Sequence, residues 1–223
     1  MEESGCGAKR GFGQAAGTYE FFSSLFSGGL IVKAKLHQLK WLQPDSKVLY
    51  LGVGAGEDAE MAAKQKVRLT CLDISKGMLA QLERKLIAGN LEAELICGNA
   101  LEHDRAGHYD AVVCNFFLNC FQEPDCIRML NHAAKLLKED GKLLIADVAA
   151  PRGNLIARLL STAYIKTGMF FFWLQGMVSL HGIYDYRQYF GMSGLELVES
   201  TGFRLAGLGP VVYETIVARK PSR

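Results

Sequence analysis

Short apolar runs alternate with longer segments of helical periodicity along the first two thirds of the chain. Runs rich in aliphatic and β-branched residues predict five strands, at 47–51, 68–72, 93–97, 111–114 and 142–146. The segments between them predict helices near 57–65, 76–88 and 125–139, and Gly141 marks the turn into the fifth strand. This alternation is typical of βαβ units, so the pattern predicts an α/β fold with a parallel sheet and helices on both faces.

The pattern changes toward the C-terminal end. Residues 194–200 predict a helix, and the runs 203–208 and 211–219 predict two strands joined by Gly209 and Pro210. A Gly-Pro pair between two such runs favours a hairpin, in which the strands are antiparallel. Together with the five earlier strands, this predicts a Rossmann-like seven-stranded, mostly parallel sheet that finishes in an antiparallel hairpin.

No linker rich in Pro and Gly divides the chain, which predicts a single domain over residues 19–223. Residues 1–18 are expected to be a flexible start, and residues 1–17 lack the apolar core of a secretory signal peptide. Two segments lie outside the predicted sheet and its helices. Residues 19–42 predict an aromatic-rich helical cover, and residues 151–190 form an apolar insertion after the fifth strand.

Composition and charge bear on two function classes, nucleic-acid binding and metal or redox chemistry at cysteines. A net charge of +2, without blocks of Lys or Arg, disfavours nucleic acid as a substrate. The six cysteines form no C-x-x-C pair, so neither a zinc ribbon nor a thioredoxin-type motif is expected, and no metal site is predicted. Cysteines within apolar runs are typical of a reducing cytoplasm, where thiols pack as small apolar groups.

A glycine-rich turn follows the first predicted strand. Gly52, Gly54 and Gly56 stand between that strand and a helix, where glycine permits a tight turn and the close approach of a ligand. A dinucleotide fingerprint would place its third glycine at position 57, which is Glu57 here. The spacing G-x-G-x-G therefore favours a cofactor without a pyrophosphate, and it disfavours the alternative of an NAD-linked oxidoreductase.

Three polar residues follow at the ends of the next strands. Asp73 closes the second strand, where a carboxylate can accept hydrogen bonds from ribose hydroxyls; its alternative role is a helix cap, which Ser75 can equally provide. Asn99 comes just after the third strand and can bond the edge of an adenine ring, or simply form a turn. Asn115 ends the fourth strand at the same edge of the predicted sheet.

These motifs resemble those of class I S-adenosylmethionine (SAM)-dependent methyltransferases, over residues 19–219. The family pattern appears here as VLYLGVGAG, CLDIS, GNA, YDAVVC and LLKEDGKLLI. The resemblance implies an enzyme with SAM as its cofactor. It assigns cofactor binding to Tyr50, Gly52, Gly54, Gly56, Asp73, Ile74, Met78, Asn99, Ala100 and Asn115. The family usually has an acidic residue at the position of Tyr50, so we expect the phenol either to weaken SAM binding or to substitute for the acid.

The layout is nearest to the small-molecule methyltransferases of ubiquinone and menaquinone biosynthesis. It shares with them an early aromatic segment at 19–22, a long insertion after the fifth strand and the tyrosine-rich stretch 184–190. The resemblance implies a small hydrophobic acceptor that is quinone-like, aromatic or lipid. Two alternatives stay open: a SAM-binding protein with lost or altered transferase activity, and methylation of a thiol or metalloid through Cys114, Cys120 and Cys126.

Methyl transfer from a sulfonium needs a base only where the acceptor loses a proton. The catalytic candidates are His181, Tyr184 and Asp147, with Asp185 and Tyr186 in the same stretch as the first two. The imidazole of His181 titrates near neutral pH, although a histidine beside a glycine is also typical of a turn.

The insertion 151–190 also bears on partners and localisation. Arg158 and Lys166 interrupt its apolar residues, so no membrane-spanning helix is expected. Two hypotheses remain for it: a helical pair that buries one face on the sheet, or an apolar acceptor pocket with peripheral membrane contact through 155–180. We expect a cytoplasmic monomer or homodimer, and the second hypothesis adds a peripheral position at the membrane.

Overall fold

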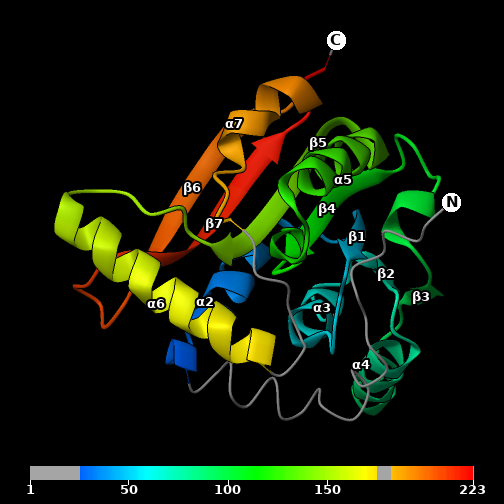
Figure 1. Ribbon diagram of the computed structural model, residues 1–223. Coiled ribbons are helices and arrows are strands. Elements are labelled where there is room, and N and C mark those ends of the chain that lie inside the picture. The colour runs from blue at the N-terminus through cyan, green and yellow to red at the C-terminus, as the bar shows by residue number, and fades with distance from the viewer. Residues whose placement is uncertain (1–25, 175–181, 223) are drawn as a thin grey trace, which may run out of the picture.

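The computed structural model describes residues 26–174 and 182–222. At its centre is a seven-stranded sheet flanked by helices on both faces (Figure 1). The strands are β1 (Lys47–Leu51), β2 (Arg68–Asp73), β3 (Glu94–Cys97), β4 (Tyr109–Asn115), β5 (Leu137–Val148), β6 (Glu196–Arg204) and β7 (Val211–Arg219). The predicted seven-stranded, Rossmann-like α/β fold is confirmed.

The strand order is β3-β2-β1-β4-β5-β7-β6. β1 to β5 run parallel to their neighbours among themselves, whereas β7 is antiparallel to both β5 and β6. The predicted C-terminal hairpin is therefore present, and its second strand lies between β5 and β6. The chain order reverses between β1 and β4, and open α/β sheets bind ligands at such a point, outside the carboxyl ends of the strands.

Helices give the sheet an apolar core on each face. They are α2 (Leu30–His37), α3 (Glu57–Ala63), α4 (Lys76–Ala88), α5 (Glu123–Leu136), α6 (Leu155–Leu174) and α7 (Arg187–Phe190), with 3-10 turns η1 (Gln38–Trp41), η2 (Ala100–Glu102), η3 (Leu118–Cys120) and η4 (Gly191–Ser193). α5 and α7 pack on one face, over side chains such as Leu49 and Val112. η1, α3 and α4 pack on the other, over Val48 and Cys71. Because the central strands are buried on both faces, they form continuous apolar runs in the sequence.

Two boundaries predicted from the sequence are wrong. Residues 194–200, predicted as a helix, lie mostly in β6, so the first hairpin strand spans 196–204 rather than 203–208. β6 is an edge strand with a largely exposed surface, and its pairing with β7, such as Leu197 opposite Ala218, overrides the local preference. The helix predicted at 125–139 ends at Leu136, because the chain passes directly into β5 there.

α2 and α6 cover the sheet around β5 and β7. Ala34 of α2 packs with Ala146 and Tyr213, and Tyr164 of α6 packs against the same cluster. Figure 1 shows α6 lying along one side of the molecule. Within residues 26–174 and 182–222, no helix has the length and apolar character needed to cross a bilayer.

Candidate functional site

The loop between β1 and α3 contains three glycines, of which the outer two are crowded by side chains and the middle one is not. Gly52, Gly54 and Gly56 have positive φ values of 65°, 58° and 70°, which glycine adopts without strain. A Cβ on Gly52 would collide with the Phe117 ring, and one on Gly56 would meet the Leu82 side chain at 2.6 Å. A Cβ on Gly54 would meet no atom within 4 Å. The middle glycine therefore faces open space, through which a ligand can approach the backbone.

Asp73 ends β2 beside this loop. Its carboxylate accepts hydrogen bonds from the backbone N–H groups of Gly54 at 2.9 Å and Ser75 at 2.8 Å. Desolvation raises the pKa of Asp73, and the backbone N–H groups oppose that shift. Ser75 caps α4 by accepting from the N–H of Met78 at 3.3 Å. The carboxylate is thus fixed at the carboxyl edge of the sheet, with lone pairs left to accept from ligand hydroxyls.

The other residues predicted around the adenosyl group differ in exposure. Ile74 is 63% exposed and offers an apolar surface directly after β2, whereas Met78 is buried against the glycine loop. Asn99 accepts from the backbone N–H of Leu101 at 3.1 Å, so its side chain forms the turn that was the alternative interpretation. Ala100 is buried in the core. The contact of Asn99 with adenine stays a prediction.

A buried carboxylate that sequence analysis missed lies beside the loop. Asp58 of α3 is 2% exposed, accepts from the side-chain amide of Asn115 at 2.7 Å, and pairs with Lys35 of α2 at 3.3 Å. Asn115 in turn accepts from the N–H of Ala146 on β5 at 3.1 Å. Four elements are therefore joined through Asp58 and Asn115. No local motif marks Asp58, because its two partners are 23 and 57 positions away in the sequence.

Tyr50 lies next to this carboxylate. The residue is 2% exposed, and its hydroxyl is 3.5 Å from the backbone oxygen of Asp58. Burial raises the pKa of Tyr50 well above its ordinary value, with the charge of Asp58 as a smaller cause, so the phenol is neutral. A neutral phenol does not supply the negative charge that the family pattern has at position 50. In this chain the buried negative charge near the loop belongs to Asp58.

These residues fit SAM in two respects. Gly54 leaves open space against the backbone, and Asp73 presents a carboxylate to which a ribose diol can donate. The glycine loop, the end of β2 and the end of β4 meet at the carboxyl edge, where the strand order reverses.

A group of aromatic side chains lies between the carboxyl end of β4 and α6. Phe116 has a left-handed φ of 51°, which is uncommon outside glycine, and its ring packs at 65° to that of Tyr213 with centroids 5.7 Å apart. Tyr164 of α6 contacts Tyr213 and stacks on Phe26 with centroids 4.7 Å apart. Phe117 contacts the glycine loop. Phe117 packs separately, with Phe121 and the core on the α5 face. We call Phe26, Phe116, Tyr164 and Tyr213 the aromatic cluster, which starts directly after β4 and extends to α6.

Asp147, predicted as a catalytic candidate, ends β5 in a fully buried position. Its carboxylate accepts from the Tyr186 hydroxyl at 2.8 Å and from the N–H of Asn119 at 3.3 Å. Desolvation raises the pKa of Asp147 to about 7, against the opposing effect of these hydrogen bonds. Tyr184 packs against the core on the α5 face, and His181 lies outside the described residues. The catalytic roles of Asp147, Tyr184 and His181 stay predictions.

Asp185, the neighbour of Tyr184 and Tyr186, belongs to a charged network. It pairs with Arg152 at 3.2 Å and with Arg187 at 2.7 Å. Both arginines also pair with Glu214 of β7, which is 2% exposed. The guanidinium groups occupy the carboxylate of Asp185, so its position favours a structural role that ties the start of α7 to β7.

The cysteines give no support to a thiol or metal site. Cys114 and Cys126 are fully buried, and desolvation raises the pKa of both thiols, that of Cys126 to about 12. In the part of the chain that the structure describes, no group of three or more His, Cys, Asp or Glu side chains is placed to hold a metal ion. Two of the three cysteines in the alternative of thiol or metalloid methylation therefore lack an accessible thiolate, whereas Cys120 is partly exposed.

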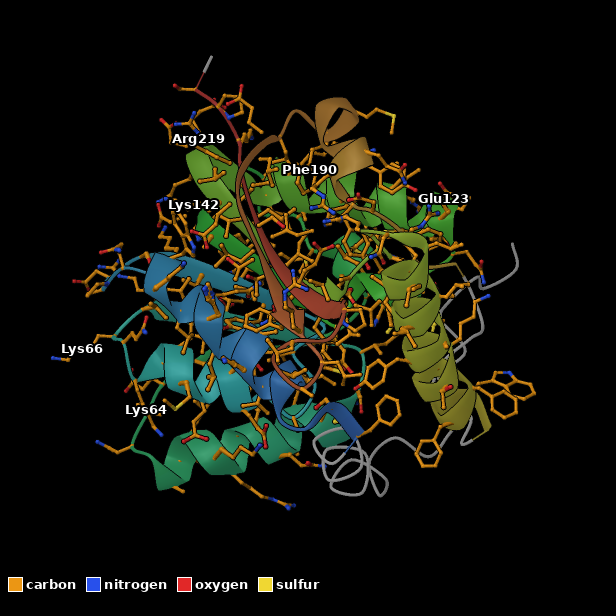
Figure 2. All side chains as sticks on the ribbon, turned by 90° about the vertical axis from the view of Figure 1, so that its left-hand side faces the viewer. Lys64, Lys66, Glu123, Lys142, Phe190 and Arg219 are labelled. Atoms are coloured by element: carbon orange, nitrogen blue, oxygen red, sulfur yellow. The ribbon has the colours of Figure 1, made fainter. Side chains whose placement is uncertain are left out.

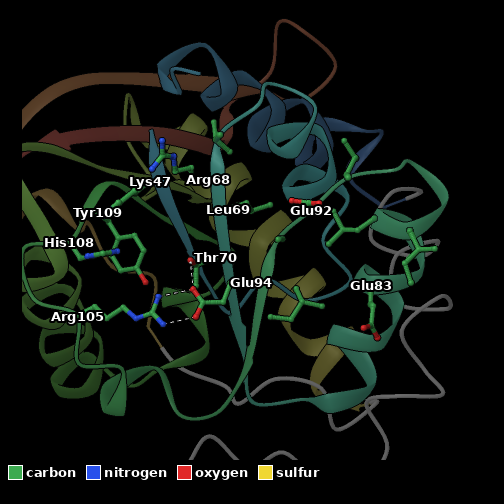
Figure 3. A pocket seen from close by; sticks show the side chains of 16 residues that line it. Lys47, Arg68, Leu69, Thr70, Glu83, Glu92, Glu94, Arg105, His108 and Tyr109 are labelled. Carbon is green, nitrogen blue, oxygen red and sulfur yellow. Dashed lines mark hydrogen bonds and ion pairs between the residues drawn. The ribbon is translucent and has the colours of Figure 1, made fainter. Parts of the chain in front are cut away.

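A separate groove lies at the amino-terminal ends of β1 to β4, away from the glycine loop. Its volume is about 850 Å³, and its lining includes Lys47, Arg68 and Tyr109. Figure 3 shows Arg105 in a two-pronged ion pair with Glu94, at 2.6 and 2.5 Å. None of the residues predicted to bind the cofactor lines this groove.

Comparisons with known proteins find similarity to methyltransferases. A family model described as a methyltransferase domain matches residues 48–141, from β1 to the start of β5. A demethylmenaquinone methyltransferase from Thermotoga maritima is 28% identical over 168 residues, which cover 72% of this chain and 69% of that protein. The sequence similarity thus includes the glycine loop, Asp73 and Asn115.

Solved structures share the fold at low sequence identity. A SAM-dependent methyltransferase from Methanosarcina mazei has a TM-score of 0.65 at 17% identity, covering 82% of this chain and 96% of that one. The 1,6-didemethyltoxoflavin-N1-methyltransferase of Burkholderia thailandensis, with 1,6-didemethyltoxoflavin and S-adenosylhomocysteine bound, has a TM-score of 0.63 at 17% identity, covering 93% and 88%. At these identities the likeness is one of fold.

Proposed function

We propose that this chain, a class I SAM-dependent methyltransferase, methylates a small hydrophobic acceptor that is quinone-like, aromatic or lipid. The observation that carries the proposal is the aromatic cluster, which starts at Phe116, next to Asn115 at the end of β4, and extends to α6. A flat apolar acceptor gains free energy there by leaving water and by contact with aromatic rings. The similarity to a demethylmenaquinone methyltransferase supports the same acceptor class.

The residues at the site act chiefly by binding and orientation. When bound, SAM supplies a methyl group on a positively charged sulfur, which an acceptor atom displaces in line. Asp73 and the backbone at Gly54 hold the adenosyl end, and Asp58 places negative charge beside the loop. The aromatic cluster holds the acceptor and excludes water from the reacting atoms. Placing the two reactants together accounts for much of the rate in such a reaction.

A phenol or an activated ring carbon must also lose a proton. The pKa of Asp147, about 7, suits proton transfer near neutral pH, but its carboxylate is buried and bonded to Tyr186. In this position Asp147 holds Tyr186 and the turn at Asn119 in place. A direct role as base would require a movement that brings its carboxylate to the acceptor.

A second candidate is a SAM-binding protein with lost or altered transferase activity. Tyr50 favours it, because the phenol is buried and neutral where the family pattern has an acid. The open space at Gly54 and the carboxylate of Asp73 favour retained binding of SAM. Fold does not determine chemistry, so the two candidates differ in reaction rather than in architecture.

Calorimetric titration with SAM, S-adenosylhomocysteine and NADH tests the cofactor first. We expect micromolar binding of the two adenosyl ligands and none of NADH. Release of S-adenosylhomocysteine is then measured with a panel of quinols, phenols and phospholipids, and with hydrophilic amines as controls. Turnover with the hydrophobic panel alone supports the proposal. SAM binding with no turnover on any compound favours the second candidate, and turnover confined to the hydrophilic amines contradicts the acceptor class.

A further inference from the structure

α6 exposes most of its large apolar side chains and buries a narrow face against the protein. Ser161 and Ile165 are 1% and 3% exposed, and Gly168 is buried. The six most exposed large apolar side chains of α6 are Leu155 (70% exposed), Ile156 (68%), Leu159 (61%), Leu160 (55%), Phe170 (51%) and Trp173 (44%). We call these six residues the outer face of α6. A helix on the surface of a globular protein normally has the opposite arrangement, with its large apolar side chains toward the core.

Specific contacts fix which face of α6 is buried. The Tyr164 hydroxyl donates to the backbone oxygen of Phe26 at 3.0 Å and lies 3.3 Å from the Tyr213 hydroxyl. Gly168 packs so closely on the Phe26 ring that a Cβ there would lie 2.8 Å from it. A rotation of the helix that buried the outer face would break these contacts. Figure 2 shows side chains of α6 projecting away from the rest of the molecule.

The charges on α6 identify the kind of partner. Its 20 residues include Arg158 and Lys166 and no acidic residue. Lys166 is exposed and follows the same helical stripe as Leu159 and Phe170. Lysine is depleted in protein–protein interfaces. At a bilayer surface, its apolar stem can lie among the lipid chains while its ammonium reaches anionic headgroups.

We propose that the outer face of α6 docks on the surface of an anionic lipid bilayer, with the helix lying in the plane of the interface. The helix is not a membrane span. It starts shortly after β5 ends at Val148, so docking places the carboxyl edge of the sheet, with the glycine loop, close to the bilayer. This inference goes beyond the proposed function, because lipid binding requires neither SAM nor an acceptor.

Flotation with phospholipid vesicles tests the docking. The protein is mixed with vesicles of phosphatidylcholine, with or without phosphatidylglycerol, in the absence of cofactor and acceptor. We expect binding to the anionic vesicles and an about tenfold weaker partition for Ile156→Asp, because a carboxylate is costly in the apolar layer. Ile87→Asp is the matched control, since Ile87 of α4 is 72% exposed and lies elsewhere on the molecule. Equal partition of the two variants, or no binding of the wild type, overturns the proposal.

Tryptophan fluorescence reports the depth of α6 directly. The chain has two tryptophans, so Trp41→Phe leaves Trp173 as the single emitter. Anionic vesicles should shift its emission to shorter wavelength, because the indole leaves water. Lys166→Glu should weaken binding to anionic vesicles and leave the weaker binding to neutral vesicles nearly unchanged. An unshifted emission in vesicle-bound protein would place another surface at the bilayer and contradict the proposal.

The competing occupant is a second copy of the chain. Sedimentation velocity without lipid measures it, and we expect the same sedimentation for wild type and Ile156→Asp. A dimer that Ile156→Asp dissociates, with no vesicle binding, would assign the outer face to self-association. Calorimetry with S-adenosylhomocysteine on Ile156→Asp separates this outcome from failure of the proposed function. Retained affinity shows an intact cofactor site whatever the result with vesicles.

Discussion

Asp73→Asn isolates the contribution of one carboxylate to cofactor binding. In the free protein the carboxylate accepts from the N–H groups of Gly54 and Ser75, at 2.9 and 2.8 Å. The asparagine side chain has nearly the same size and keeps one oxygen as an acceptor. We therefore expect the fold to persist, with a loss of about 1 kcal/mol in the free energy of unfolding for the hydrogen bond that is not replaced.

Asp73→Asn should cost more free energy in cofactor binding than in folding. A hydroxyl that donates to a carboxylate contributes about 1.5–3 kcal/mol, and an amide oxygen recovers only part of that. The dissociation constant of S-adenosylhomocysteine should therefore rise several-fold, with roughly 150-fold as the upper limit. Because desolvation raises the pKa of Asp73, the wild type should also lose affinity as the pH falls through that raised pKa. The Asn variant should lack this pH dependence.

Calorimetry at several pH values measures both effects, and Asp110→Asn is the matched control. Asp110 accepts from the backbone N–H of Lys47 at 2.8 Å and pairs with Lys138 at 2.6 Å, near the amino-terminal end of β4. The control should therefore lose stability without losing affinity. Equal affinities of Asp73→Asn and Asp110→Asn would refute the assignment of the β2 end to the ribose.

Three further substitutions test other parts of the site. Gly54→Ala should abolish most SAM binding measured by calorimetry. Gly28→Ala is the control, because Gly28 has a similar φ of 57° and equally open space, so it should lose only about 1–2 kcal/mol in urea unfolding from backbone strain. Equal SAM affinities of the two variants would contradict the role of the loop. Asp147 has a folded pKa raised from 3.8 to about 7, so it contributes stability below about pH 4 that is lost as the pH rises through 7. As the pH rises from 4 to 8, the wild type should therefore lose stability relative to Asp147→Asn, by at most about 4 kcal/mol in urea unfolding. If the difference in unfolding free energy between the two proteins stays constant over this range, the buried carboxyl does not titrate there. Lys35→Met should lower the free energy of unfolding by about 1–3 kcal/mol, and by less in an Asp58→Asn background; additive losses would exclude coupling of the pair.

The strands predicted correctly from the sequence are those encoded over short distances. β1 and β2 are continuous apolar runs, and Gly54 follows the first while Asp73 ends the second, so the fold and the candidate motif can be inferred together. Asp58 could not be found this way, since it joins Lys35 and Asn115 across the fold. The edge strand β6 was mistaken for a helix because its pairing with β7, rather than its own pattern, determines its conformation.

The α6 segment shows a different limit of sequence analysis. Its apolar composition is evident, but composition alone left open whether the helix buries one face or contacts a membrane. Which face of α6 is buried depends on Gly168, which allows close contact with the Phe26 ring, and on Tyr164, whose hydroxyl donates to the backbone oxygen of Phe26. These contacts decide which residues face outward, and they depend on a partner 138 positions away from Tyr164.

The position of β7 in the sheet also has a consequence for biosynthesis. β7 lies between β5 and β6, although both are translated before it. Until residues 211–219 leave the ribosome, β5 has no partner on one side and β6 has no neighbour at all. An unpaired strand edge in a nascent chain invites pairing with other chains. Emergence of β7 therefore completes the sheet in a single late step, and slow synthesis of this segment should lower the yield of folded protein.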